Sequence, residues 1–228
     1  IVGVSKKEFM VHKNIIAVRA RDLYELVITE EESSNDESDI KTIMLLDVDE
    51  TAFETILKFI YMDEVPTMKV YDDDEEKVTL ILLTANRFGC TDLKLYMESI
   101  LTEKFLIPST AAGLLLLADS HSCALLKEAT MNMYASNSKD VMESSQDDWM
   151  KLKESNDLLV ELLVYTNNVG GRKQYSSVVD NGNGTIDDVD DFDVTSLRER
   201  LQQQNVDLDL DGSREILVER WKNYLRRS

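Results

Sequence analysis

The N-terminal segment alternates apolar and polar positions with the two-residue period of an extended chain. Its apolar positions are Val2, Val4, Phe9 and Val11. The polar run 5–7 separates the two halves, so the pattern predicts a β-hairpin over residues 1–12. A second apolar run, IMLLDV at 43–48, has the length of a buried strand. Together the two segments predict a small sheet.

Helical periodicity follows the hairpin and returns after each acidic interruption. Apolar residues at helix-like intervals predict helices over 13–28, 51–62, 78–85 and 93–101. Thr51 and Glu54 have the spacing of a capping box, which predicts the start of the second helix. Gly89 is expected to end the third helix. The acidic runs 29–39 and 72–76 are expected to separate helices, the first as a solvated loop.

The rest of the chain divides into three segments of different character. From 108 to about 168 the periodicity is helical without interruption. Residues 169–193 contain the glycine-rich sequences GG and NGNG together with six aspartates. This composition predicts a flexible acidic linker. Residues 194–228 contain two amphipathic helical patterns around the turn DLDLDG. We therefore predict four parts, with an N-terminal domain at 1–107, a helical extension at 108–168, the linker and a two-helix module.

Composition and charge exclude several classes of protein. The chain is 43% hydrophobic and 30% charged, which supports a folded core. Its 25 basic and 44 acidic residues give a net charge of −19, so the chain as a whole is repelled by phosphate. This excludes a generally basic binder of nucleic acid or membrane surfaces. Residues 194–228 hold seven basic and six acidic side chains, so the acidic excess lies before them.

Cysteine content and hydropathy indicate the cellular compartment in which the protein is expected. Two cysteines, Cys90 and Cys123, are too few for a disulfide scaffold or for a structural zinc site with four ligands. No apolar run approaches the roughly 18 residues of a spanning helix, and no signal-peptide pattern opens the chain. We expect an intracellular protein of the nucleus, the cytoplasm or both, without a membrane partner. A start at Ile1 is what a fragment or processed chain would show.

No constellation of catalytic residues emerges from the sequence. His12 and His121 are the only histidines, and no nucleophile and base order, phosphate-binding glycine loop or H-E-x-x-H spacing is present. The linker places Asn181 and Asn183 at EF-hand spacing, but Val179 at the first ligand position offers no oxygen. We therefore expect a protein that is not an enzyme, with no catalytic residue, metal site or cofactor.

Three ordered motifs carry a family resemblance. FMVHKNIIAVR at 9–19, FETILKFIY at 53–61 and LLTANRFGCTDLK at 82–94 resemble a BTB (POZ) domain. LLLLADSHSCALLKEATMNMY at 114–134 is similar to the helices after that domain in the speckle-type POZ family. The resemblance covers about residues 1–165. It implies an α+β fold, in which helices flank a small sheet, and an all-α extension.

The same resemblance implies a function. Members of the family form homodimers and dock on a cullin scaffold as substrate adaptors of a ubiquitin ligase. In their cullin contact, an apolar residue precedes a glutamate by two positions after the second helix, and Ile28 and Glu30 match that spacing. An exposed aliphatic anchor can supply most of the affinity of such a contact. Alternatively, Ile28 closes the last turn of a core helix and Glu30 is solvated. The sequence departs from the family in two respects, since the usual first strand and dimerising helix are absent before Ile1 and the acidic loop is longer.

The C-terminal module resembles a SAP domain, a helix-turn-helix unit that binds DNA. Leu197 and Leu201 on its first helix and Leu217 on its second match the family pattern. A glycine before the second helix would let the backbone approach a phosphate, which the helix N-terminus favours. The candidate nucleic-acid-binding residues are Arg198, Arg200, Gly212, Ser213, Arg214 and Lys222. Three aspartates in the same loop oppose this, so a protein-binding module with solvated arginines stays open.

These observations predict a homodimeric cullin adaptor that is tethered to DNA or chromatin by its tail. Its partners would be a cullin scaffold, a second copy of the chain, an unknown protein substrate and DNA. The alternative is a chromatin scaffold or transcription cofactor whose BTB domain only self-associates. The sequence names neither the substrate nor a DNA preference.

Overall fold

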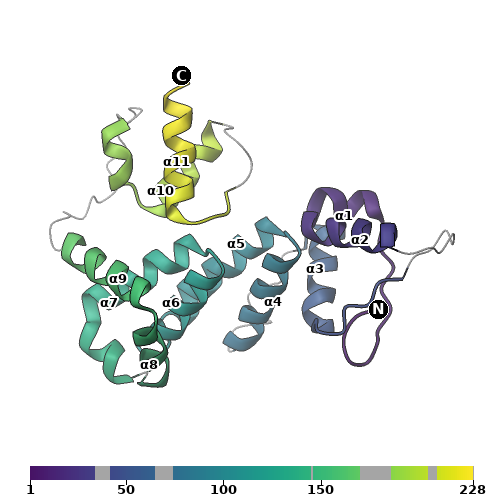
Figure 1. Cartoon of the computed structure of the whole chain (residues 1–228), viewed down its shortest axis with the longest axis horizontal. Coiled ribbons are helices and arrows are strands. Elements are labelled where there is room, and N and C mark those ends of the chain that lie inside the picture. Colours follow the sequence, from purple (N-terminus) through teal and green to yellow (C-terminus); the bar gives the residue numbers. More distant parts are fainter. Residues whose placement is uncertain (34–41, 65–73, 145, 170–185, 205–209, 228) are drawn as a thin grey trace. The chain divides into compact units, whose positions relative to one another are not determined.

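The computed structural model is a succession of helices joined by turns and short loops (Figure 1). It describes residues 1–33, 42–64, 74–144, 146–169, 186–204 and 210–227. The chain divides into two compact units, unit 1 at Ile1–Leu101 and unit 2 at Thr102–Ser228. Among the described residues, no helix has both the length and the apolar character needed to cross a membrane.

The described residues of unit 1 form five helices and a short N-terminal turn. The helices are α1 (Lys13–Arg19), α2 (Arg21–Ser33), α3 (Glu50–Met62), α4 (Glu75–Arg87) and α5 (Thr91–Ile100). Phe53 of α3 lies at the centre of the core, where its ring meets the edges of Phe9 at 5.2 Å and Phe88 at 5.6 Å between centroids. Edge-to-face packing of this kind adds to the burial of apolar area. The helical periodicity thus correctly predicted α3, α4 and α5, whereas the single helix predicted over 13–28 is broken at Ala20 into α1 and α2.

The small sheet and the α+β fold class predicted from the sequence are wrong. Within the described ranges no strand forms, and Val2 makes only isolated bridges, antiparallel with Lys7 and parallel with Leu45. The backbone turns left-handed at Gly3, with φ 72°, and again at Lys6, with φ 58°. The chain therefore leaves the extended conformation directly after one paired residue, and neither the predicted hairpin nor the second strand continues.

Two predicted helix boundaries also differ. Helix α3 is capped by Asp49, whose Oδ1 accepts the amide of Ala52 at 2.8 Å, and Thr51 lies inside the helix. Helix α2 continues to Ser33 through the first part of the acidic run that was expected to be a loop. Glutamates have good helix propensity, so an acidic run need not end a helix. Gly89, with φ 67°, follows α4 as predicted.

Unit 2 is helical from its first residues. After the π-helical turn η2 (Leu101–Phe105), its elements are α6 (Ala111–Ser120), α7 (Ala124–Ser144), α8 (Gln146–Glu154), α9 (Asn156–Val169), η3 (Ile186–Asp191), α10 (Val194–Gln203) and α11 (Arg214–Leu225). Helix α7 is kinked at Asn137, where φ is −136° and ψ is 39°. A core of buried side chains joins α6 to α9, with Leu115, Met131, Leu152, Leu158 and Leu162. The continuous helical pattern of 108–168 is confirmed.

Part of the predicted linker is ordered. Residues 186–191 form the 3-10 helix η3, whose Val189 is fully buried. Asn181 and Asn183, the asparagines of the calcium-loop interpretation, lie outside the described residues. The boundaries between the four predicted parts stay predictions.

Candidate functional site

Helix α2 carries the predicted cullin contact in unit 1. Leu23 and Val27 are buried on one face of this helix, at 3% and 8% exposure, and fix its orientation. Ile28, the next residue, is half-buried, and Glu30 is exposed. Because α2 runs on to Ser33, both residues lie inside the helix and not after it. The structure thus presents an aliphatic side chain at the border of the core face.

The surroundings of Ile28 are acidic. Glu25, one turn earlier on α2, is exposed and pairs with Arg21 at 3.1 Å. The Thr29 hydroxyl donates a hydrogen bond to the carbonyl of Glu25 at 2.9 Å, so this side chain bonds within its own helix. The helix thus offers a partner the half-buried Ile28 and, two positions later, the exposed carboxylate of Glu30. Such a surface is complementary to an apolar pocket with a basic rim.

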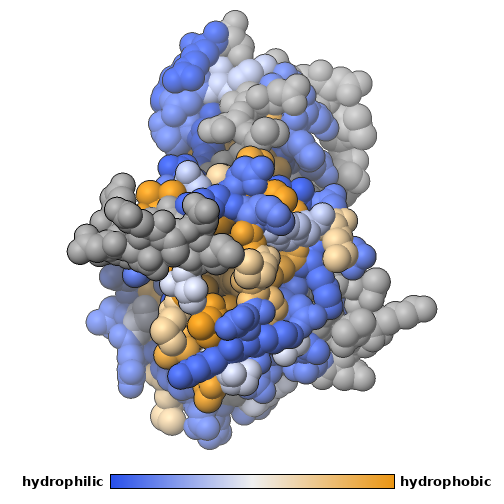
Figure 2. Space-filling view, turned by 90° about the vertical axis from the view of Figure 1, so that its right-hand side faces the viewer, coloured by the Kyte–Doolittle hydropathy of each residue, from blue (hydrophilic) through white to orange (hydrophobic). Residues whose placement is uncertain are grey.

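Unit 1 exposes further apolar side chains. Figure 2 shows hydrophobic surface between hydrophilic side chains on the side of the molecule at the right of Figure 1. The large hydrophobic residues exposed in this unit are Val4, Met10, Val18, Met44, Leu46, Tyr61 and Met62. A cavity of about 450 Å³ lies among residues 8–11, 42–45 and the inner face of α2. These exposed side chains are candidates for contact with another protein.

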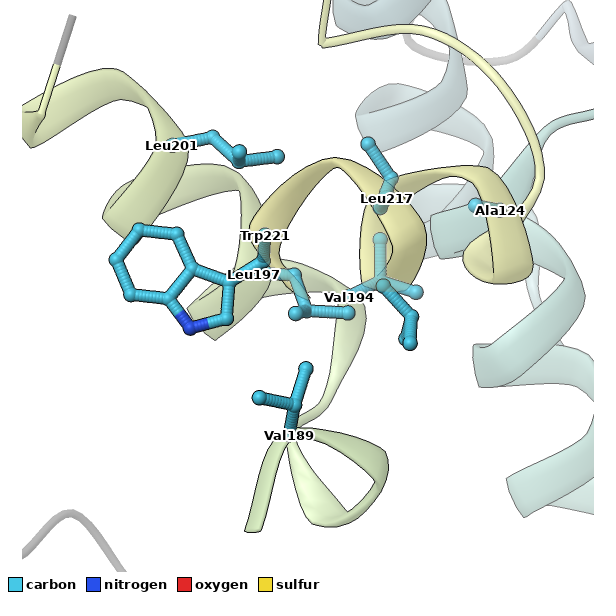
Figure 3. Close-up of a cluster of buried hydrophobic side chains, with 8 residues drawn as sticks. Ala124, Val189, Val194, Leu197, Leu201, Leu217 and Trp221 are labelled. Atoms are coloured by element: carbon cyan, nitrogen blue, oxygen red, sulfur yellow. The ribbon is translucent and has the colours of Figure 1, made fainter. Parts of the chain in front are cut away.

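In unit 2, helices α10 and α11, here called the C-terminal helical pair, enclose their own apolar core (Figure 3). The buried side chains are Ala124, Val189, Val194, Leu197, Leu201, Leu217, Val218 and Trp221. Ala124 comes from α7 and Val189 from η3, so the pair folds against both elements. Trp221 stacks on Tyr224 with 5.1 Å between centroids, and its buried Nε1 finds no acceptor among the described residues.

Two predicted phosphate contacts, Arg214 and Lys222, point to η3. The Arg214 guanidinium donates to the carbonyls of Asp190 at 2.7 Å and Phe192 at 2.9 Å. Lys222 binds both carboxylate oxygens of Asp190, at 2.8 and 2.9 Å. Arg214 also lies 3.9 Å from the carboxylate of Glu128 on α7. The structure brings these two cations together, but each is engaged inside the unit.

The other two predicted cations are engaged as well. Arg198 donates from Nε to the carbonyl of Leu210 at 3.2 Å. Arg200 lies over the ring of Phe192, 4.3 Å from its centroid. The first contact is made within the module and the second with Phe192, which precedes α10, so these side chains are not simply solvated. Either cation must leave its contact, or share it, before it meets a phosphate.

The turn before α11 contains a glycine with positive φ, as predicted, but a carboxylate lies at the same helix N-terminus. Gly212 has φ 117°, and Ile216 lies 3.1 to 3.3 Å from where its Cβ would stand. Ser213 is the N-cap residue of α11, and its side chain hydrogen-bonds to Glu215. Burial alone would raise the pKa of Glu215, but this bond and nearby cations lower it. A carboxylate therefore stays ionised at the helix N-terminus, which weakens its attraction for an external anion.

Sequence reasoning missed the residues that organise this module. Glu128 lies 66 positions before Val194, whose amide it accepts, and no local pattern indicates such a pairing. Asp190 lies in a segment predicted to be a flexible linker. The only available signal was the apolar spacing of Val189, Phe192 and Val194, which continues the pattern of the following helix backwards. Among the described residues, no group of histidine, cysteine and carboxylate side chains is placed to hold a metal ion.

Comparison with known proteins identifies the N-terminal part of the chain. A family model described as BTB/POZ domain matches residues 1–105. Over 157 residues, 69% of this chain, the sequence is 28% identical to TD and POZ domain-containing protein 3 of Mus musculus. TD and POZ domain-containing protein 2 of the same organism is 27% identical over 161 residues. The chain spans about 40% of the length of these curated relatives.

Proposed function

We propose that this chain, whose residues 1–105 are a BTB/POZ domain, is a substrate adaptor of a cullin-based ubiquitin ligase. BTB/POZ domains generally self-associate and bind partner proteins, which is the role of an interaction domain and not of an enzyme. The exposed apolar side chains of unit 1 suit both activities. The adaptor would act by proximity, since a bound substrate is held near the ubiquitin-carrying end of the ligase.

The observation that carries this proposal is the position of Ile28 on α2. It is half-buried at the border of the core face, so an aliphatic anchor is partly accessible, and Glu30 adds an exposed carboxylate two positions later on the same helix. Burial of one such anchor can dominate the affinity of an interface. Ile28 would enter an apolar pocket of the cullin, while Glu30 would face basic residues at its rim.

Cullin capture by the full chain tests the proposal. Ile28→Asp should abolish capture because it places a charge in the contact, whereas Val160→Asp, at an exposed position of α9 in unit 2, should leave it unchanged. Circular dichroism and thermal unfolding of both variants control for the fold. Unchanged capture by Ile28→Asp would contradict the anchor. If the wild-type chain captures no cullin, the alternative of a self-associating chromatin scaffold or transcription cofactor is favoured.

The tail would tether the adaptor to duplex DNA in the nucleus. Gly212 precedes α11 with a positive φ, and Arg198, Arg200, Arg214 and Lys222 stand on the two helices around it. Binding to a short duplex should weaken steeply as salt is raised, and Arg214→Glu should reduce it. Binding that is absent at the lowest salt would leave the helical pair as a protein-binding element.

A further inference from the structure

Glu128 links α7 to the C-terminal helical pair by two separate contacts. Its Oε2 accepts the amide of Val194 at 2.9 Å, and its Oε1 lies 3.9 Å from Nε of Arg214. The side chain is only 12% exposed, so both contacts are shielded from solvent. Charge-assisted bonds in such surroundings are stronger than exposed ion pairs. One carboxylate therefore reaches the first residues of both helices of the pair.

The contact at Val194 completes the cap of α10. Asp193, the N-cap residue, satisfies the amide of Ser196 at 2.7 Å. The amide of Val194 has no acceptor within its own helix, as is usual in the first turn. Glu128 of α7 accepts its hydrogen bond instead. A negative charge there also complements the helix dipole. Loss of this side chain would leave a buried donor without its acceptor, which is costly.

Neighbouring contacts bring the same surfaces together. Ala124, one turn before Glu128, is 3% exposed and packs in the core of the pair (Figure 3). Cys123 forms an isolated parallel bridge with Gly212, directly before α11. Lys127 binds Asp119 and Glu161 at 2.8 and 2.7 Å, and its charge also helps to lower the pKa of Glu215 on α11. Of these two adjacent charged residues, Glu128 is the one that hydrogen-bonds to the pair.

We propose that Glu128 is an intramolecular latch, which docks the C-terminal helical pair onto α7 and withholds Arg214 from external phosphate. The latch keeps the guanidinium between Glu128 and the carbonyls of Asp190 and Phe192. Release of the latch removes the carboxylate that competes with an external anion for Arg214, and it loosens the start of α10. The part that concerns duplex binding rests on the tethering function proposed above, and the docking itself does not.

Hydrogen exchange of the full chain tests the docking. In Glu128→Ala, peptides from Val194–Gln203 should exchange about ten-fold faster than in the wild type, because a buried charge-assisted bond is lost. Glu199→Ala, which removes an exposed carboxylate of α10 itself, should leave exchange unchanged. Equal exchange in the wild type and Glu128→Ala would overturn the latch. If Glu128→Ala does not fold, Glu128→Gln takes its place: it keeps an acceptor for Val194 but loses the charge, so the same peptides should still exchange several-fold faster than in the wild type, and equal exchange would overturn the latch.

Duplex binding tests the masking of Arg214. Glu128→Ala should bind a short duplex at low salt several-fold more tightly than Glu199→Ala, although both lose one negative charge. A second change, Arg214→Gln, should return the affinity of the Glu128→Ala chain to that of Glu199→Ala. Equal affinities of the two single variants would overturn the masking. If no chain binds duplex, the tethering function fails, and the exchange result alone decides the latch.

Discussion

Arg87 binds both carboxylate oxygens of Asp47. Its NH1 lies 2.7 Å from Oδ2 and its NH2 lies 3.2 Å from Oδ1. The pair connects the last turn of α4 to the segment before α3, across 40 positions of the sequence. The hydrogen bonds from Arg87 lower the pKa of Asp47 below its usual value. The folded state therefore favours the ionised carboxylate.

The sign of this shift predicts a pH dependence. A carboxyl group with a lowered pKa stabilises the fold above its unfolded pKa of about 4, and this stabilisation is lost as the pH falls through the lower folded value. Asp47→Asn should thus reduce the fall in stability between pH 7 and pH 3, measured by urea unfolding. The difference should be small and should shrink in high salt, because both side chains are largely exposed. Identical pH profiles of unfolding free energy for the wild type and Asp47→Asn would contradict this role of the Arg87–Asp47 pair.

The start of α3 gives a prediction that separates the observed cap from the one expected from the sequence. Asp49→Ala removes the acceptor of the Ala52 amide and should cost about 1 kcal/mol of unfolding free energy. Thr51→Ala, two residues later, should change it by less than about 0.5 kcal/mol, because Thr51 makes no cap. Chemical denaturation of both variants decides the matter. A larger loss in Thr51→Ala would restore the capping box.

The start of α3 shows which features local sequence patterns predict and which they do not. Periodicity placed α3 correctly because Phe53, Ile56 and Ile60 face one core. The spacing of Thr51 and Glu54 was present, yet Glu54 pairs instead with Lys7 and Lys58, at 2.8 and 3.2 Å. An acidic residue directly before the helix competes for the cap position, and only the backbone geometry decides between them.

The predicted sheet is wrong, and the partners of the tail cations were not predicted, for reasons that alternation and charge do not encode. The hairpin pattern is real, but left-handed turns at Gly3 and Lys6 stop the pairing after Val2. The cations of the tail were expected to face outwards, because their partners, Asp190 and Glu128, lie far away in the sequence. The charge of a side chain is known from the sequence, whereas the residue that pairs with it is determined by tertiary packing.

Gly89 provides a prediction about backbone conformation. Its φ is 67°, and a Cβ there would lie 3.0 Å from the backbone nitrogen of Asp22. Gly89→Ala should therefore destabilise unit 1 by roughly 1–3 kcal/mol, because strain and close approach add up. Gly113→Ala is the matched control, since Gly113 lies within α6 and meets only the carboxylate end of Asp148. It should be close to neutral in thermal unfolding. Equal losses in the two variants would contradict this reading of Gly89.

The thiol of Cys90 should be inert in the folded chain. Burial raises its pKa to about 12, and the side chain is 1% exposed. At pH 8 the thiol is then almost wholly protonated, and the thiolate is the form that reacts. Iodoacetamide at pH 8 should leave Cys90 unmodified in native buffer and alkylate it in urea, as followed by peptide mass spectrometry. Phe88→Ala, which opens the neighbouring core, should raise the native rate, whereas rapid labelling of the wild-type chain would show that Cys90 is accessible.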